Sequence, residues 1–384
     1  MTISVLLPTR NRLEYLAQAI ESVRAQDSSD WEIVISDNDS EEDIRGHVEE
    51  LGDERIRYAR TERFLPVTEN WNRALSMSRG EYVVMMGDDD ALLPGYIRAM
   101  ERLIAAREAP ELIYVGSLLF TYPGVDPAHP AGFLAPNSFA EFFGDGPEPS
   151  AVDHPAAVAA VRRSMAFRHV FNFNMQLSLV SRELIERVRG KGEFFQSAFP
   201  DFYATCAAML NARAMLADPT PRVVIGVTPK SYGFFHLNEQ ESAGREFLGA
   251  GQEGRQAPGT NLNEGWLAAM ETLERHWGAG FGLSVDHRRY RMIQAGHVYT
   301  SRFRGSASEQ DLARLQRTLP LHERLLFSAG YGLARVLARL LPQRLWDLLS
   351  RRALGQYPGW EPEREEGRYA TILEVFESRR REQV

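Results

Sequence analysis

Two patterns of apolar and polar residues alternate along residues 1–120. Short apolar runs typical of buried strands cover residues 3–7, 31–35, 55–59, 82–86 and 112–116. Between these runs, apolar residues recur at helical spacing, as in residues 13–23. The alternation predicts an α/β fold with a mostly parallel sheet and helices on both faces.

The pattern changes after residue 120. Residues 121–155 contain seven prolines and four glycines, which predicts a long loop. Further elements are then predicted: strands at 174–180 and 222–228, a strand-like stretch at 232–235, and helices at 153–167, 181–188 and 202–210. The glycine-rich residues 244–263 are predicted to be mobile.

The last part of the chain has only helical spacing. The predicted helices cover residues 262–277, 288–304, 308–318 and 322–341, and the last dozen residues are predicted to be solvated. We therefore expect an α/β domain over residues 1–240, followed over residues 241–384 by a mobile loop and an α-helical C-terminal region.

Composition narrows the function classes. The chain has 384 residues and a formal net charge of -8, which disfavours a general affinity for nucleic acid. Its one cysteine, Cys206, excludes an intramolecular disulfide and a cysteine-based zinc cluster. Residues 1–8 predict a strand and not a signal peptide, and no apolar run reaches the ~18 residues of a spanning helix. We expect a cytoplasmic protein, either soluble or peripheral on the inner face of the membrane.

An acidic cluster follows the apolar run at residues 82–86. Gly87 is succeeded by Asp88, Asp89 and Asp90, whose carboxylates repel one another unless a positive group lies among them. Mg²⁺ or Mn²⁺ prefers carboxylate oxygen, and open α/β sheets bind ligands at the carboxyl ends of their strands. The cluster predicts a metal-assisted site for a phosphorylated ligand. The alternative is an acidic surface turn, with Asp90 favouring the positive end of the next helix.

Two other predicted strands also end in polar turns. Residues 8–12 supply two cations, and residues 36–40 supply hydrogen-bonding groups and carboxylates. Together the three turns suit a nucleoside diphosphate. The first strand is not followed by Gly-x-Gly-x-x-Gly, and the chain has no Walker phosphate loop, so a nicotinamide enzyme or an ordinary ATPase is disfavoured.

The order and spacing of these motifs resemble those of family 2 glycosyltransferases, which are inverting enzymes of the GT-A fold. The resemblance covers residues 2–240 and rests on Pro8-Thr9-Arg10-Asn11-Arg12, on Asp37-Asn38-Asp39-Ser40, on residues 70–75, and on residues 80–90 with Pro94. It implies a nucleotide-sugar-binding half at residues 1–120 and an acceptor half at residues 121–240, which includes the long loop 121–155.

The resemblance assigns a set of residues to the donor nucleotide. They are Pro8, Thr9, Arg10, Asp37, Asn38, Asn72 and Asp88. Asn38 stands where the family usually has an acid. Asn72 has an alternative role in capping or packing a helix.

The family's metal motif is Asp-x-Asp, and the resemblance implies Mg²⁺ or Mn²⁺ as the cofactor. Its first position falls on Gly87 and its second on Asp89, so Asp89 is the expected main ligand. Asp90 is expected to be a supporting ligand or a helix cap. His236 matches a family histidine that closes over the diphosphate, and imidazole is a plausible third ligand.

Inverting transfer needs a base that takes the proton of the acceptor hydroxyl. The family carries an acid before a helix, and Asp201 in residues 199–203 is the matching residue. Its alternative role is a helix N-cap, and Glu193 is the reserve candidate. The implied mechanism has the metal and Arg10 offsetting the charge of the departing diphosphate while Asp201 accepts the proton.

The last predicted helices, in residues 322–352, mix leucines with arginines. One interpretation is contact with anionic lipid beside a lipid-linked acceptor. The other is a helical hairpin packed on the catalytic domain or a homodimer face. The family resemblance implies a glycan, a lipid-linked glycan or a surface polysaccharide of the cell envelope as the acceptor.

The main hypothesis is thus a metal-dependent, inverting, hexosyltransferase-type enzyme that uses a nucleoside diphosphate sugar. One alternative is a weakly active or inactive binder of nucleotide sugars or glycans, which the acid missing at Gly87 and the proline before Asp201 favour. A sugar nucleotidyltransferase is the other alternative, although it would need a glycine-rich loop after the first strand.

Overall fold

The computed structural model describes residues 1–107, 109–144, 146–238, 240–248, 259–304, 309–340, 342, 345 and 363–382. Two compact units form. The first unit contains Met1–Val161, Phe171–Ala250 and Pro362–Val384, and the second contains Arg162–Val170 and Gly251–Glu361.

Parallel strands form the first half of the sheet in the first unit. They are β1 (Ile3–Thr9), β2 (Trp31–Asp37), β3 (Ile56–Arg60) and β4 (Tyr82–Met85). They lie in the order β4-β1-β2-β3 and all pair in parallel. Every residue of β2 and β4 is buried, as strands covered on both faces require.

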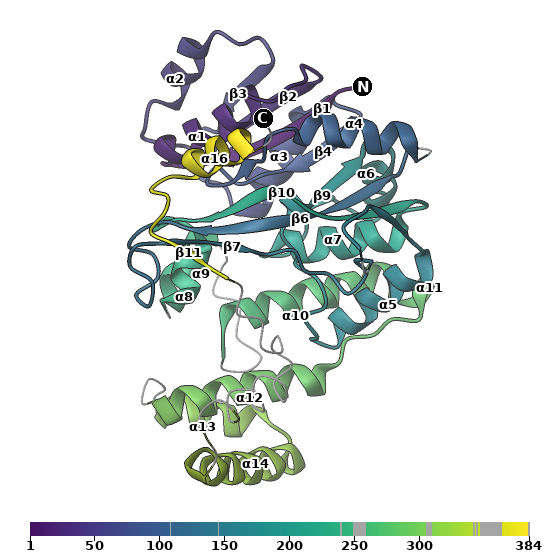
Figure 1. Ribbon diagram of the computed structural model, residues 1–384. Helices are drawn as coiled ribbons and strands as arrows, with labels where there is room; N and C mark the ends of the chain where they lie inside the picture. The colour runs from purple at the N-terminus through teal and green to yellow at the C-terminus, as the bar shows by residue number, and fades with distance from the viewer. Residues whose placement is uncertain are drawn as a thin grey trace. The chain divides into compact units, whose positions relative to one another are not determined.

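Three helices connect these strands, and a fourth, α4, leads on to the second half of the sheet. They are α1 (Leu13–Arg24), α2 (Ile44–Leu51), α3 (Val67–Met77) and α4 (Tyr96–Ala106). In α2, the Asp43 side chain accepts the backbone N–H of Gly46, and Gly52 ends the helix in the left-handed conformation. Figure 1 shows this alternation of strands and helices, which confirms the α/β class.

The second half of the sheet is mixed. Its strands are β5 (Ala91–Leu92), β6 (Leu112–Thr121), β7 (Phe133–Pro136), β8 (Ser150–Val152), β9 (Ser178–Ser181) and β10 (Met215–Val227). β6 and β10 are parallel, whereas β9 is antiparallel to both β4 and β6 and so joins the two halves. The associated helices are α5 (His154–Met165), η1 (Met175–Leu177), α6 (Arg182–Arg189), α7 (Pro200–Asn211), α8 (Tyr232–Leu237) and α9 (Glu241–Leu248).

The C-terminal segment returns to the first unit. β11 (Glu365–Glu366) pairs with β7, and α16 (Ile372–Glu382) packs beside α1, as Figure 1 also shows. Ile372 and Val375 are buried in one apolar cluster with Phe120 and Leu134. The prediction that the last dozen residues are solvated is therefore wrong, because α16 completes a core whose other members, apart from Tyr369, precede it by more than a hundred residues.

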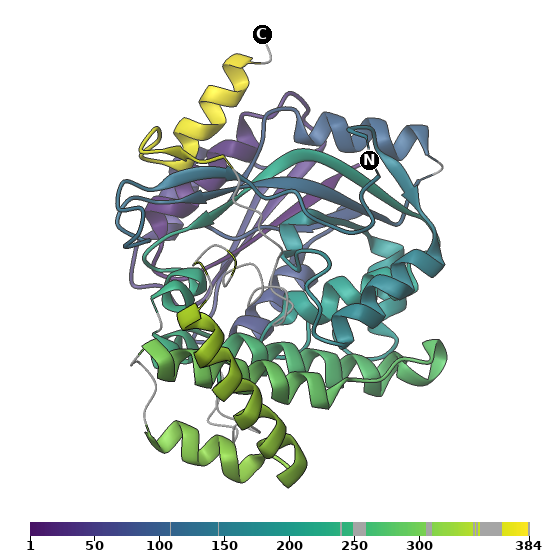
Figure 2. The same cartoon turned by 60° about the horizontal axis from the view of Figure 1, so that its bottom comes forward.

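The second unit is helical. Its elements are α10 (Asn261–Leu273), the π-helix η2 (Glu274–Gly278), α11 (Ala279–Phe281), α12 (His287–Arg304), α13 (Glu309–Thr318) and α14 (Leu321–Leu340). Figure 2 shows α12, α13 and α14 lying side by side, around a core that includes Val298 and Leu315. Across the described ranges, no helix has the length and apolarity to cross a membrane.

Three segments differ from their predictions. Residues 232–235 belong to the helix α8, and residues 175–177 form the short helix η1 ahead of β9. The segment 121–155 contains β7 and β8, so sheet pairing interrupts the expected loop. Of the stretch expected to be mobile, residues 249–258 lie outside the described residues.

Candidate functional site

The carboxyl ends of several strands meet at one edge of the sheet. Thr9 closes β1 and is paired in register with Asp37, which closes β2. The N–H of Met86, just after β4, donates to the carbonyl oxygen of Leu6, so the acidic cluster begins beside the end of β1. β10 delivers Thr228 to the same place. The topology thus assembles the three turns expected from the sequence.

Arg12 lies at the centre of this edge. Its two terminal nitrogens each form an ion pair of 2.6 Å, one with Asp88 and the other with Asp89. The nitrogen that binds Asp89 also donates to Thr228 Oγ1 at 2.8 Å. The residue is only 8% exposed, and in the described structure its Nε–H is buried without a hydrogen-bond partner. One guanidinium therefore bridges two carboxylates and keeps an unused donor.

The second oxygen of Asp88 and both oxygens of Asp90 are also engaged. Thr9 Oγ1 donates to Asp88 Oδ2 at 2.7 Å. Asp90 accepts three N–H groups, from the backbones of Gly87 (2.8 Å) and Gly226 (2.9 Å) and from the side chain of Gln176 (3.0 Å). Burial raises the pKa of the Asp90 carboxyl well above its usual range. Asp90 thus fastens the cluster to β10 and to η1.

Two glycines permit this close packing. A Cβ at Gly226 would lie 1.8 Å from the backbone oxygen of Asp89, and a Cβ at Gly87 would lie 2.6 Å from Asp90 Oδ2. Position 226 therefore cannot carry a side chain without moving the backbone of the cluster. Position 87, where the family's first metal-binding acid would stand, has no room for one unless the Asp90 carboxylate moves.

The expected divalent cation does not fit this arrangement. No group of three His, Cys, Asp or Glu side chains within the described ranges is placed to hold a metal ion. Asp88 and Asp89 are bridged by a guanidinium, and Asp90 is turned to N–H groups. His236 lies on α8 and is not grouped with these acids as a ligand set.

The turn after β2 is held rigidly. Asp37 accepts the backbone N–H of Ser40 at 3.1 Å and the hydroxyl of Tyr58 at 2.6 Å. The Asn38 amide makes two hydrogen bonds of 2.8 Å to the backbone of Leu65. Both side chains are buried, so their remaining polar edges are fixed in direction, as a nucleobase site requires.

Further cations lie on the turn after β1. Arg10 is exposed and its guanidinium lies 4.5 Å from the centre of the Phe64 ring. Lys230 Nζ donates to the backbone oxygen of Asn11 at 2.8 Å, which fixes an ammonium over the turn that carries Arg12. Pro8 lies within β1 itself.

Asn72 has a structural partner in place. Its amide donates to the backbone oxygen of Phe195 at 2.8 Å and accepts the N–H of Phe195 at 3.1 Å. It thereby ties α3 to the segment before α7. These two bonds match the packing alternative for Asn72.

Asp201 lies in the first turn of α7, after Phe199 as N-cap and Pro200 as the first helical residue. Its Oδ1 accepts the N–H of Phe202 at 3.1 Å. The residue keeps partial solvent access, while the surrounding protein raises the pKa of its carboxyl to about 7. One turn later, Thr205 Oγ1 contacts Met175 in η1, the residue before Gln176.

These contacts link Asp201 to the cluster through Thr205, η1 and the Gln176–Asp90 hydrogen bond. The reserve candidate, Glu193, has a side chain that is 61% exposed and lies 3.8 Å from Arg189. Asp201 is therefore the better placed of the two acids to act as a base near neutral pH.

Sequence reasoning missed several members of the site. Arg12 was expected only as one of two cations in its turn, while Tyr58, Gln176, Thr228 and Lys230 were not expected there at all. Thr228 and Asp89 are 139 residues apart. Only the pairing of β10 within the sheet brings them together, so no local sequence motif predicts this contact.

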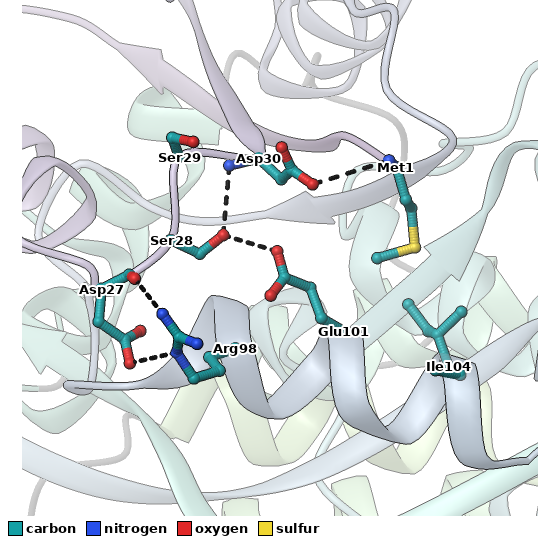
Figure 3. A pocket seen from close by; sticks show the side chains of 9 residues that line it. Met1, Asp27, Ser28, Ser29, Asp30, Arg98, Glu101 and Ile104 are labelled. Atoms are coloured by element: carbon teal, nitrogen blue, oxygen red, sulfur yellow. Dashed lines mark hydrogen bonds and ion pairs between the residues drawn. The ribbon is translucent and has the colours of Figure 1, made fainter.

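A hollow of about 590 Å³ lies at the opposite, amino ends of β1 and β2. Figure 3 shows its polar groups paired with one another: Arg98 with Asp27, and Ser28 with Glu101. Because these groups satisfy each other and lie away from the acidic cluster, we do not count the hollow as part of the site.

Comparison with known proteins gives the following relatives. A family model described as "Glycosyl transferase family 2" matches residues 4–172. The GalNAc(5)-diNAcBac-PP-undecaprenol beta-1,3-glucosyltransferase of Campylobacter jejuni is 37% identical over 101 residues, which are 26% of this chain and 33% of that protein. The putative colanic acid biosynthesis glycosyl transferase WcaA of Escherichia coli is 36% identical over 94 residues, 24% of this chain and 34% of that protein.

The chain thus spans about a third of the length of these curated relatives. Among solved structures, S. aureus TarS 1-349 has a TM-score of 0.47 and 17% sequence identity, covering 96% of this chain and 99% of that one. The matched residues 4–172 contain Arg12, Asp37 and the acidic cluster. Through that segment, which is less than half of the chain, the protein is similar to glycosyl transferase family 2.

Proposed function

We propose that this chain transfers a sugar from a nucleoside diphosphate sugar to an acceptor hydroxyl, with inversion at the anomeric carbon. The observation that carries the proposal is the grouping of Arg12, Asp88 and Asp89 beside Asp37, at the carboxyl ends of parallel strands within the segment that matches the family. This edge offers hydrogen-bonding groups for a nucleoside and cations for a diphosphate.

The proposed reaction uses the residues at hand. The acceptor oxygen forms a bond to the anomeric carbon, while the bond from that carbon to the diphosphate oxygen breaks. Asp201 takes the hydroxyl proton, for which its raised pKa of about 7 is well matched. Arg12, Arg10 and Lys230 offset the charge of the departing diphosphate. The remaining donor residues proposed are Pro8, Thr9, Asp37, Asn38, Asn72 and Asp88.

The sequence predicted a divalent metal with Asp89, Asp90 and His236 as its ligands. We assign no step to it, because the carboxylates of the cluster already bind Arg12 and backbone N–H groups.

We further propose a lipid-linked glycan of the cell envelope as the acceptor. The Campylobacter relative acts, by its name, on an undecaprenol diphosphate-linked glycan. An acceptor of that kind lies in a membrane, so an enzyme that acts on it benefits from a surface that binds lipid.

An exposed apolar side of the helix α14 supports this proposal. Its exposed apolar side chains are Leu321, Leu325, Leu326, Leu333, Val336 and Leu340. At about 3.6 residues per turn they fall within an arc of roughly 140°. The other side of the helix packs through Phe327 and Tyr331 on the core of the second unit.

The charges of α14 suit anionic lipid. Residues 321–340 contain three arginines and a single acid, Glu323. Glu323 is 2% exposed and is paired with Arg291 at 2.7 Å, so the exposed side of the helix carries no negative charge. We therefore propose that α14 binds the anionic inner face of the membrane, in preference to a second copy of the chain.

A hydrolysis and transfer assay tests the main proposal. The protein is incubated with uridine, guanosine and thymidine diphosphate sugars, with Mn²⁺ or with chelator, and the released nucleotide is identified. We expect release of a nucleoside diphosphate from one donor class, and a loss of at least about 100-fold in Asp201→Asn. The matched control is Glu193→Gln, which we expect to retain activity.

Other products would overturn the proposal. Pyrophosphate as the product would indicate a sugar nucleotidyltransferase. Tight nucleotide-sugar binding without release, in any acceptor mixture, would indicate a binding protein on the same scaffold.

A further inference from the structure

A cation already occupies the position between the acids of the cluster. Arg12 reaches Asp88 and Asp89 with separate nitrogens, each at 2.6 Å, whereas a purely structural arginine more often grips one carboxylate with two parallel bonds. Bridging two carboxylates is what a divalent ion does at such a site. The structure therefore gives the guanidinium the place of a metal.

The guanidinium has donors left for a ligand. A guanidinium carries five N–H groups, and the Nε–H of Arg12 is buried with no partner in the described structure. Burying a hydrogen-bond donor without a partner costs free energy, so the unpaired Nε–H of Arg12 needs an explanation. A phosphate oxygen would satisfy it, and the planar guanidinium suits phosphate geometry.

Neighbouring residues also favour a fixed cation over a metal ion at this cluster. Gly87 has no room for the acid that would complete a metal set, since its Cβ would lie 2.6 Å from Asp90 Oδ2. Both oxygens of Asp90 accept backbone N–H groups. Lys230, held on the backbone of Asn11, adds a second fixed cation over the same turn.

We propose that Arg12 replaces the divalent cation: held by Asp88 and Asp89, its guanidinium binds the donor's diphosphate, and sugar transfer proceeds without a metal. This inference rests on the proposed function, because it concerns the same donor site. It makes Arg12 a catalytic residue that stabilises charge on the leaving group.

The test compares the wild-type chain with Arg12→Ala and Arg12→Lys. Binding of uridine, guanosine and thymidine diphosphates is measured by calorimetry in EDTA and again in Mn²⁺, and bound Mn²⁺ is measured by electron paramagnetic resonance without nucleotide. We expect the wild type to bind a nucleotide equally well in EDTA and to hold no Mn²⁺. Arg12→Ala should lose on the order of 10- to 100-fold in affinity in EDTA, and Arg12→Lys should lose less.

The control for loss of a partly buried ion pair is Arg187→Ala. Arg187 pairs with Glu111, which lies beside the start of β6 and of β10, away from Thr228. It should keep full nucleotide affinity. Circular dichroism and thermal melting show whether each variant is folded, and Arg12→Lys preserves the charge if Arg12→Ala unfolds.

The outcomes separate the two claims. Nucleotide binding that appears only with Mn²⁺, or a wild-type chain that binds Mn²⁺ at the cluster, would overturn the inference and leave the transferase proposal standing. Unchanged affinity in folded Arg12→Ala would also overturn it. If no nucleotide binds under either condition, the proposed function fails together with the inference.

Discussion

At the scale of single residues, Asp201 links the structure to a measurable pH dependence. Its carboxyl has a pKa of about 7, raised by burial from the ordinary value of ~3.9. A base must be unprotonated to act, so kcat/KM should fall about tenfold per pH unit below pH 7 and level off above it. Initial rates between pH 5 and 9 measure this profile.

The same shift predicts an effect on stability. The folded chain holds this proton more tightly than the unfolded chain, so the contribution of Asp201 to stability decreases as the pH rises from about 4 to 7. The free energy of unfolding of Asp201→Asn, measured with denaturant at several pH values, should lack this part of the pH dependence. A wild-type rate that stays level down to pH 5 would contradict the role of Asp201 as the base.

The sequence predicted many of these residues but not their partners. Asp37 and Asp88 lie at the strand ends where the motifs place them, because strand ends are local features of a sequence. The bridge made by Arg12 was not predicted, since the geometry of an arginine depends on what the fold brings within its reach. Asn72 is the opposite case. The resemblance assigns it to the donor nucleotide, but its side chain is hydrogen-bonded to the backbone of Phe195.

At the scale of elements, α14 yields a prediction about membranes. The double variant Leu325→Glu/Leu333→Glu places charge on the exposed apolar side, where the two residues are 64% and 61% exposed. Binding to vesicles that contain anionic lipid should fall by at least about tenfold, because buried apolar area and charge attraction both decrease. Sedimentation with vesicles measures the effect.

The control for α14 is Ala313→Glu, which adds one charge to an exposed position of α13. It should bind vesicles much as the wild type does. If the wild-type chain ignores vesicles but elutes as a dimer that the double variant abolishes, α14 is a subunit interface and the membrane proposal is wrong.

Element prediction succeeded where periodicity is long and failed where segments are short. The helices α12 and α14 begin and end within a residue or so of their expected bounds. Residues 232–235 favour a strand by their aromatic content, yet they form α8, whose Tyr232 ring packs edge-on against Phe199. Tertiary packing overrode a weak local preference.

At the scale of the whole molecule, the C-terminal segment should be essential for the stability of the first unit. A chain that ends at residue 362 would lack α16 and expose the cluster that contains Phe120 and Leu134. We expect its melting temperature to fall by roughly 5 °C or more, with weaker nucleotide binding. Thermal melting and calorimetry test this.

Adding back a peptide of residues 363–384 should restore part of the loss. A shortened chain that melts like the wild type would show that α16 only covers the unit without stabilising it. The return of the C-terminus to the first unit was beyond sequence reasoning, because pairing between distant segments leaves no periodic signal near either one.

The position of α16 also constrains how the protein is made. On a ribosome, residues 1–161 emerge long before residues 363–382, which supply Ile372 and Val375 to the core around Tyr122. Tyr122 packs edge-on against Tyr15, whose ring lies 5.7 Å from the Arg12 guanidinium. Until residues 363–382 have been synthesised, the nascent chain therefore exposes the apolar surface that α16 later covers, and chaperones can bind it. The packing around Arg12 is completed only after that.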